Sequence, residues 1–291
     1  MNQLNHFVSI GRYLQAGITA LLKLSLLPIT CILYAVILPG LTSCEKENAE
    51  SMYQDSTLLM KVKSGDLVIK ELTYTGSGKI HEVLEAYSYK RYSYNAKNQL
   101  SKLEIVISIN PASCFMPTGT AIEAGADPRK AQATEYTDFE YDASGTLSKR
   151  SNYYSNSGVF TLFSYEILEW NDDKISKIST FNPSGALTHY NIYEYDADSN
   201  LEHNYYYTVA NDAEDKLIYT HTFEFDTKNN PYRVFTAEGV PGLYTNKNNI
   251  TKDTYVYNAS SGSQYTTNYY YEYNTLGYPV KVNDNAYIYG E

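Results

Sequence analysis

A short unit recurs along this sequence and most constrains its fold. Two aromatic or large apolar residues flank one residue, Asn or Asp follows, and after a few turn formers come an apolar residue and, two positions later, a basic one. The copies are Tyr92-Ser93-Tyr94-Asn95 with Leu100 and Lys102, Phe139-Glu140-Tyr141-Asp142 with Leu147 and Lys149, Leu168-Glu169-Trp170-Asn171 with Ile175 and Lys177, Tyr193-Glu194-Tyr195-Asp196 with Leu201 and His203, Phe223-Glu224-Phe225-Asp226 with Pro231 and Arg233, and Tyr271-Glu272-Tyr273-Asn274 with Pro279 and Lys281. Residues two apart share one face of a strand, and Asn and Asp favour turns. Each copy therefore predicts a β-hairpin.

Composition and spacing extend this prediction to the whole chain. The 32 Tyr residues favour pleated, half-buried surfaces. Tyr74 precedes a Gly-rich segment and resembles a degenerate earlier copy, and a second kind of turn, such as Asn182 to Gly185, lies between successive units. Two turns per repeat predict an all-β, antiparallel meander of repeated hairpins. Rings on both faces, in place of a purely aliphatic core, favour a strongly curved sheet or an open barrel.

The register within a hairpin has two alternatives. If Tyr94 pairs with Leu100, a regular ladder sets Tyr92 against Lys102, and in the same way Phe139 against Lys149 and Tyr271 against Lys281. A register shifted by one residue instead sets each central Glu against the base as an ion pair. We prefer the first, which places a ring against an aliphatic side chain next to the turn. In both, the Glu residues point away from the flanking rings.

The first 43 residues have the pattern of a signal peptide. Arg12 and Lys23 are their only charged residues, and Leu24 to Pro39 is nearly all apolar. Leu41-Thr42-Ser43-Cys44 resembles the lipobox of bacterial lipoproteins, which implies cleavage before Cys44 and its lipidation. The alternative is an ordinary membrane anchor with a chance Cys.

We expect an acidic tether over residues 44–60, followed by a single β-meander domain over residues 61–291. The acidic stretch after Cys44 resembles the surface-export signal of Bacteroidota lipoproteins. This resemblance implies an outer-membrane lipoprotein exposed at the cell surface; otherwise the protein faces the periplasm. Two segments without alternation, about 110–133 and 239–252, interrupt the repeats. They are candidate lids or specificity loops, or loops merely tolerated at the ends of the meander.

Net charge limits the partners. Removing the signal peptide leaves 21 basic against 33 acidic residues, a formal charge of −12. Nucleic acid is therefore not expected as a partner, because phosphate binding needs clustered Lys and Arg. Contact with a membrane is expected through the lipid anchor alone.

The repeats resemble the YD repeats of RHS-type proteins, in which a Tyr-Asp pair and a Gly-rich turn recur in a β-spiral. They are more similar to a Bacteroidota lipoprotein family of unknown function that has a porin-like β-fold. The matching features are Phe223 to Pro231, Asn248-Asn249-Ile250, and Tyr271-Glu272-Tyr273-Asn274 with Gly277, Tyr278 and Pro279. The resemblance runs from about Leu67 to the C-terminus, and it implies no catalytic residue.

We find no motif for catalysis, a cofactor or a metal. Cys114 is left alone after processing, and His81, His189, His203 and His221 show no metal-ligand spacing. Asp196 to Asn200 imitates the start of a calcium loop, but Leu201 stands where that loop needs Gly. We therefore expect a protein that is not an enzyme and needs no cofactor.

The leading function is non-catalytic binding of a glycan or a protein partner. The candidate binding or ladder aromatics are Tyr92, Tyr94, Tyr141, Trp170, Tyr193, Tyr195, Phe225, Tyr271 and Tyr273. Exposed aromatic rings are enriched at binding surfaces. The alternative is a structural or assembly subunit of an envelope complex, joined at a sheet edge; a hydrolase ranks third.

Overall fold

The computed structural model describes residues 57–107, 127–210, 214–258 and 262–290. Cys44, Cys114 and most of the segment 110–133 lie outside the described residues. The described strands are β1 (Leu59–Ser64), β2 (Leu67–Tyr74), β3 (Ile80–Glu85), β4 (Ser88–Tyr94), β5 (Leu100–Ile107), β6 (Glu135–Tyr141), β7 (Leu147–Asn156), β8 (Val159–Asn171), β9 (Lys174–Phe181), β10 (Leu187–Tyr195), β11 (Leu201–Thr208), β12 (Lys216–Asn229), β13 (Asn248–Tyr257), β14 (Ser263–Asn268), β15 (Tyr271–Tyr273), β16 (Pro279–Val282) and β17 (Asn285–Tyr289). Two short 3₁₀ helices, η1 (Pro128–Lys130) and η2 (Pro231–Glu238), complete the described elements.

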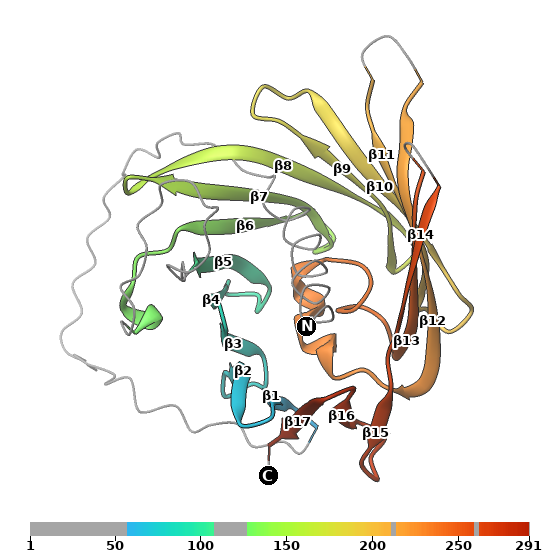
Figure 1. Ribbon diagram of the computed structural model, residues 1–291. Helices are drawn as coiled ribbons and strands as arrows, with labels where there is room; N and C mark the ends of the chain where they lie inside the picture. The colour runs from blue at the N-terminus through green and yellow to red at the C-terminus, as the bar shows by residue number, and fades with distance from the viewer. Residues whose placement is uncertain (1–56, 108–126, 211–213, 259–261, 291) are drawn as a thin grey trace, which may run out of the picture.

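The strands form one antiparallel, 17-stranded sheet in the described part of the chain. Consecutive strands pair from β2 to β14 and again from β15 to β17. The N-terminal strand β1 pairs with both β2 and β17, so the two ends of the domain lie side by side. Figure 1 shows the sheet curled around a central space. The predicted all-β meander and its strong curvature are confirmed.

The turns after four of the units, at Asn95, Asp142, Asp196 and Asn274, have the predicted chemistry. In the turn at Asp142, the Oδ1 atom accepts the backbone N–H groups of Ser144 and Thr146, and Gly145 lies at φ 89°. A side-chain oxygen that binds the backbone just beyond it is what makes Asp and Asn turn formers. The backbone bond that closes this turn recurs in the described residues at Thr75, Asn95, Asp142, Asn182, Asp196 and Asn274. Asn182 thus has the same turn as the units, and the separate class predicted for it is wrong.

The preferred register is right at the second aromatic and wrong at the first. Tyr141 pairs with Leu147 as predicted, but Phe139 pairs with Arg150, and Glu140 faces Lys149. The reason is a β-bulge at Ser148, an extra residue that shifts the ladder by one position. Corresponding shifts lie directly before Tyr94, Trp170, Tyr195 and Tyr273. Both registers weighed from the sequence therefore occur, one on each side of the bulge.

The bulge explains the Ser that follows the apolar residue in several units and the ion pair between the central Glu and the base. The Ser148 hydroxyl donates to the Glu140 carbonyl at 3.2 Å. Ser101 and Ser176 do the same at 3.0 and 3.2 Å in their own hairpins. The shift also makes the predicted ion pairs on the outer face, where Lys149 Nζ lies 2.6 Å from Glu140 Oε1. Equivalent pairs form at Glu169–Lys177, Glu224–Lys252 and Glu272–Lys281.

The second aromatics form a ladder across neighbouring hairpins, which we call the aromatic ladder. Each ring donates its polar hydrogen to the backbone carbonyl at the start of the apolar strand in the preceding hairpin. The bonds are Tyr74 to Leu59 at 2.6 Å, Tyr94 to Ile80 at 2.7 Å, Tyr141 to Leu100 at 2.9 Å, Trp170 to Leu147 at 2.7 Å and Tyr195 to Ile175 at 2.8 Å. The unit repeats because each copy supplies a donor to its neighbour. The predicted ladder thus works through ring-to-backbone bonds.

Residues 230–247 lie inside the curl (Figure 1), and we call this segment the plug. Asn230 caps η2 by accepting the Tyr232 N–H, and its amide donates to the carbonyls of Leu243 and Asn246. Phe235 of the plug is 1% exposed and belongs to the apolar core formed by the inner face of the sheet.

The plug changes the interpretation of the Phe223 unit. Pro231 and Arg233 are not its strand partners, because they lie in η2. Phe225 instead pairs with Ile250, and Lys252 supplies the base opposite Glu224. The segment 239–252, predicted to lack regular structure, consists of the second half of the plug and the first residues of β13. The insertion was predicted from about residue 239, but a Pro at the apolar position of the unit concealed its first half, residues 230–238.

The described residues include no helix that is both long and apolar enough to cross a membrane.

Candidate functional site

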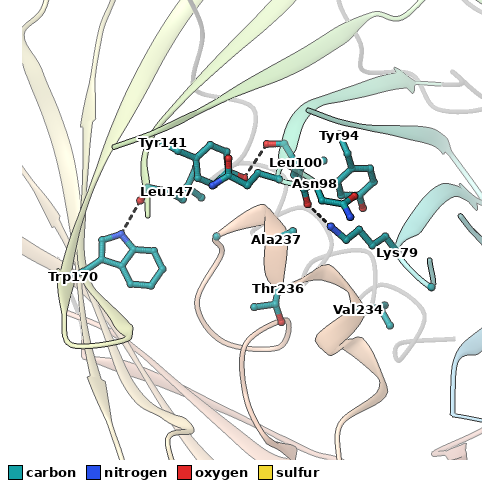
Figure 2. A pocket seen from close by; sticks show the side chains of 13 residues that line it. Lys79, Tyr94, Asn98, Leu100, Tyr141, Leu147, Trp170, Val234, Thr236 and Ala237 are labelled. Carbon is teal, nitrogen blue, oxygen red and sulfur yellow. Dashed lines mark hydrogen bonds between the residues drawn. The ribbon is translucent and has the colours of Figure 1, made fainter. Parts of the chain in front are cut away.

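A hollow of about 360 Å³ lies between the aromatic ladder and the plug (Figure 2), and we call it the ladder pocket. One wall holds Tyr94, Tyr141 and Trp170, with the aliphatic side chains of Leu100 and Leu147 between them. Its volume is at the lower end of the range of about 300–1,000 Å³ that is usual for small-molecule sites. Mostly aromatic and aliphatic linings with a few polar groups are also typical of such sites.

The rings of this wall are held rigidly. Trp170 Nε1 donates to the Leu147 carbonyl, and the Tyr141 hydroxyl donates to the Leu100 carbonyl (Figure 2). Burial is the main cause of the raised pKa of Tyr141, so its hydroxyl stays protonated and remains a donor. Because these polar atoms already have partners, the rings can offer their apolar faces to a ligand. Trp170 is 36% exposed, which leaves room for that contact.

Two turns supply the polar groups of the pocket. Lys79 Nζ donates to the Asn98 carbonyl and lies 5.0 Å from the centre of the Tyr94 ring. Gln99 Nε2 donates to the Gly145 carbonyl at 3.0 Å and so ties one turn to the next. The Lys79 ammonium and the side-chain amides of Asn98 and Gln99 are thus placed beside an aromatic wall.

The plug forms the opposite wall through Val234, Thr236, Ala237 and Gly239. The Thr236 hydroxyl donates to the Tyr244 carbonyl at 2.8 Å, which fixes this wall to the rest of the plug. Gly239 has φ 63°, and a Cβ there would lie 2.4 Å from Leu147 Cδ2. Only glycine permits both this backbone conformation and so close an approach to the sheet.

The lining can bind but offers little for acid–base chemistry. Among the described residues that line the pocket, Lys79 is the one with an ionised side chain, and none is Asp, Glu, His or Cys. General acid–base catalysis usually depends on a carboxyl, imidazole or similar group within reach of the substrate. Stacking and hydrogen bonding are therefore the chemistry that this geometry supports.

Charged groups elsewhere inside the curl hold the plug in place. Tyr92 donates to Glu238 Oε1 at 2.6 Å, and Arg150 donates to the Glu238 and Gly239 carbonyls at 2.8 and 3.2 Å. The Arg150 side chain also forms an ion pair with Glu166, and both side chains are about nine-tenths buried. Each of these groups has a structural partner, so we assign them to plug attachment.

A second, partly buried group of charges lies next to the plug. Lys70 Nζ is 2.9 Å from Glu85 Oε1, and Lys90 Nζ is 3.6 Å from Glu85 Oε2. Burial alone would raise the pKa of Glu85, but the attraction of Lys90 and Lys70 holds it well below its ordinary value. Lys70 also lies 5.5 Å from the ring centre of Phe235. The carboxylate thus stays ionised and keeps both ammonium groups in place against the plug.

The predicted aromatics fall into three places. Tyr94, Tyr141 and Trp170 line the ladder pocket. Tyr92 lies inside the curl under Glu238, and Tyr193 lies on the same inner face. Tyr195 is in the ladder beyond the pocket, Phe225 pairs with Ile250, and Tyr271 and Tyr273 donate to the Ile250 carbonyl and to Asp226. Cys44, the predicted lipidation site, lies outside the described residues.

Sequence reasoning missed the polar side of the pocket and its plug wall. Lys79 and Gln99 both occupy the last position of the shared turn, directly before the apolar residue that opens the next strand. Aligning the degenerate copy at Tyr74 with the others would have placed these two side chains in neighbouring turns. Nothing local in the sequence points to Val234, Thr236 or Ala237, because their position depends on the path of the plug.

A row of rings lies on the same face of β10 to β14, away from the pocket. Its members are His189, Tyr206, Tyr219, Tyr255 and Tyr265, with successive ring centres 5.2, 4.6, 5.5 and 6.3 Å apart. Tyr219, His221 and Phe223 share this face, and His221 Nδ1 lies 2.9 Å from Asp253 Oδ1. Burial lowers the pKa of His189 to about 4.

We expect His189 to make the protein less stable in mild acid. The folded state favours the neutral ring. The contribution of His189 to the free energy of unfolding is therefore complete above the unfolded pKa of about 6.5 and is lost as the pH falls toward 4. A shift of this size corresponds to at most about 3 kcal/mol, and to roughly half of that for a part-buried ring. Urea unfolding at pH 7.5 and 4.5 should show a smaller pH-dependent loss in His189→Gln than in the parent protein. His203→Gln is the control, since His203 lies opposite Glu194 where β10 pairs with β11. An equal change in both variants would contradict the prediction.

No group of three His, Cys, Asp or Glu side chains in the described ranges has the geometry to hold a metal ion. The calcium-like segment is an ordinary turn, in which Asp196 Oδ1 accepts the Asn200 N–H at 2.8 Å. Asn200 in turn anchors β13, because its amide oxygen accepts the Asn248 N–H at 2.9 Å.

No known family model and no curated protein matches this chain. Similar solved structures include a porin-like protein from Bacteroides vulgatus, with 11% identity and a TM-score of 0.35; the match covers 80% of this chain and 99% of that chain. A porin-like protein from Bacteroides uniformis is similar at 14% identity and a TM-score of 0.34, and the match covers 77% of this chain and 86% of that chain. The Photorhabdus luminescens Tc holotoxin pore is similar at 15% identity and TM-score 0.28 over 69% of this chain. This chain spans only 9% of the toxin chain. These similarities are too loose to assign an activity.

Proposed function

We propose that this chain is a lipid-anchored protein of the cell envelope that binds a glycan in the ladder pocket without catalysing a reaction. The lipobox-like segment ending at Cys44 supports the anchor and the envelope location. The observation that carries the binding proposal is the fixed aromatic wall of Tyr94, Tyr141 and Trp170, with polar turn groups beside it and the plug across the hollow. Apolar ring faces match the C–H faces of sugars, and amides and an ammonium match their hydroxyl groups.

The shape of the site favours a glycan over a protein partner. Protein interfaces of standard size bury about 800 Å² on each partner and are broad surfaces. The ladder pocket is instead a hollow of about 360 Å³ bounded by the aromatic ladder and its turns on one side and by the plug on the other. A sugar of one or a few rings fits that confinement, with its rings stacked on the wall.

The test is a glycan array of bacterial, plant and host oligosaccharides, followed by calorimetry with whichever glycans bind. Trp170→Leu is expected to weaken binding by about two- to tenfold, because an aromatic contact contributes about 0.5–1.5 kcal/mol beyond burial and about 1.4 kcal/mol is a factor of ten. Tyr265→Leu is the matched control: this ring is 57% exposed and lies outside the pocket. No binding on the array, or equal loss in both variants, would overturn the proposal.

A further inference from the structure

The charge of the ladder pocket differs from the charge of the chain. The whole sequence carries 33 acidic against 23 basic residues. Among the described residues lining the pocket, Lys79 is the only charged side chain and no carboxylate is present. The lining therefore carries one positive charge and no negative one in an otherwise acidic protein.

Lys79 also differs from eight other lysines of the described residues. Lys61, Lys70, Lys90, Lys149, Lys177, Lys247, Lys252 and Lys281 each lie within ion-pair distance of a carboxylate. In the described residues Lys79 has no such partner; its contacts are the Asn98 carbonyl and the Tyr94 ring. An ammonium group has three N–H donors, so the contact with Asn98 leaves donors available. The charge is placed at the pocket without being neutralised by the protein.

The Lys79 charge lies at the opposite side of the pocket from Trp170. Figure 2 shows Trp170 at one side of the pocket and Lys79 at the other, with Tyr141 and Leu100 between them. A sugar ring stacked on Trp170 or Tyr141 would extend its substituents toward Lys79. Asn98, on the side of Lys79, and Gln99, whose amide reaches toward Gly145, would meet hydroxyl groups.

Building on the proposed glycan-binding function, we propose that the ladder pocket selects acidic sugars, with Lys79 recognising a sugar carboxylate. Lys79 is the residue that determines this specificity, and the aromatic wall supplies the part of the affinity shared with neutral sugars. Hydrogen bonds between an ammonium and a carboxylate are roughly twice as strong as bonds between neutral groups. A neutral sugar of the same shape would leave the Lys79 charge without its partner.

The sequence provides a probe for the test, because Trp170 is the single Trp of the chain. Its fluorescence can be titrated with trigalacturonate and with the neutral galactose trisaccharide, and calorimetry on the same pairs detects binding that leaves fluorescence unchanged. We expect the acidic sugar to bind at least tenfold more tightly. Its affinity should fall as NaCl rises from 50 to 500 mM, since salt screens an exposed charge pair.

Lys79→Met should remove this preference. The variant is expected to bind the acidic sugar at least tenfold more weakly and the neutral sugar within twofold of the parent protein. Lys97→Met is the matched control, because Lys97 lies in the adjacent turn but does not line the pocket. It removes one positive charge nearby and should change neither affinity.

The outcomes separate the two proposals. Equal affinity for the two sugars, or an equal loss for both in Lys79→Met, overturns the acidic specificity and leaves glycan binding standing. Binding of neither sugar, together with an empty glycan array, overturns both. An equal effect of Lys97→Met would show that net charge, and not Lys79, sets the preference.

Discussion

We expect the Arg150→Met variant to lose about 3–5 kcal/mol of unfolding free energy, the range for removing one partner of a buried ion pair. Arg150 is paired with Glu166, and only about a tenth of each side chain is exposed. The substitution would leave the Glu166 charge buried without a partner. It would also remove the donor for the Glu238 and Gly239 carbonyls at the end of η2. The sheet and the plug would both lose a contact.

The neighbouring residue provides the control. Lys149 pairs with Glu140 at 2.6 Å on the outer face, where the Glu140 side chain is 55% exposed. Exposed pairs of this kind contribute about 0.2–1 kcal/mol, so Lys149→Met should cost no more than that. Urea unfolding of both variants measures the difference. Similar losses in the two variants would contradict the role of the buried Arg150–Glu166 pair in holding the sheet and the plug together.

A double variant tests the cause. Arg150→Met combined with Glu166→Leu removes both charges, and a buried ion pair can be replaced by apolar residues at little cost. We expect the double variant to recover part of the loss of the single one. Full recovery would mean that the two plug carbonyls do not depend on Arg150, and no recovery would assign the loss to those carbonyls alone.

Local chemistry made the hairpins predictable. In most units the Asn or Asp binds the backbone just beyond it, as Asp142 does with Ser144 and Thr146, and needs no distant contact to do so. The alternation of rings and Glu also fixed which side chains face outward: Glu140 and Glu194 are exposed as predicted. Short-range patterns of this kind can be seen in a single sequence.

The bulge could not be predicted from the same patterns. An extra residue at Ser148 changes the pairing only on one side of itself, so a regular ladder accounts for either Tyr141 or Phe139 but not for both. In the sequence the bulge is visible only as two registers that conflict with each other. One register fits the pairing of Tyr141 and the other fits the pairing of Glu140, and the two are compatible only if one additional residue lies between them.

Long-range features were beyond the sequence for a different reason. The pairing of β1 with β17 joins the two ends of the domain, and no local signal sets that register. The plug was hidden because Pro231 stands where the unit needs an apolar residue, and the pattern therefore appeared unbroken. One wall of the ladder pocket is formed by the plug. The aromatic wall of the pocket could be predicted from the sequence, and the wall formed by the plug could not.

The second large effect is expected for Phe235→Ala, which should cost about 3–5 kcal/mol, the range for truncating a buried Phe. Phe235 is 1% exposed, and its ring centre lies 4.9 Å from that of Tyr244 and 6.3 Å from those of Tyr92 and Tyr232. It is the apolar anchor by which the plug joins the core. Phe163→Ala is the control, because Phe163 is 40% exposed and should cost far less.

The same substitution tests whether the plug builds the pocket. Val234 and Thr236 flank Phe235 in the chain, and both line the hollow opposite Trp170. If Phe235→Ala loosens the plug, Trp170 emission should shift to longer wavelength in the folded protein, and hydrogen exchange should rise over residues 230–247 before the strands are affected. A variant that loses stability while Trp170 emission and plug exchange stay unchanged would show that Phe235 supports the sheet alone. The pocket would then depend on the aromatic ladder and the turns, and not on the plug.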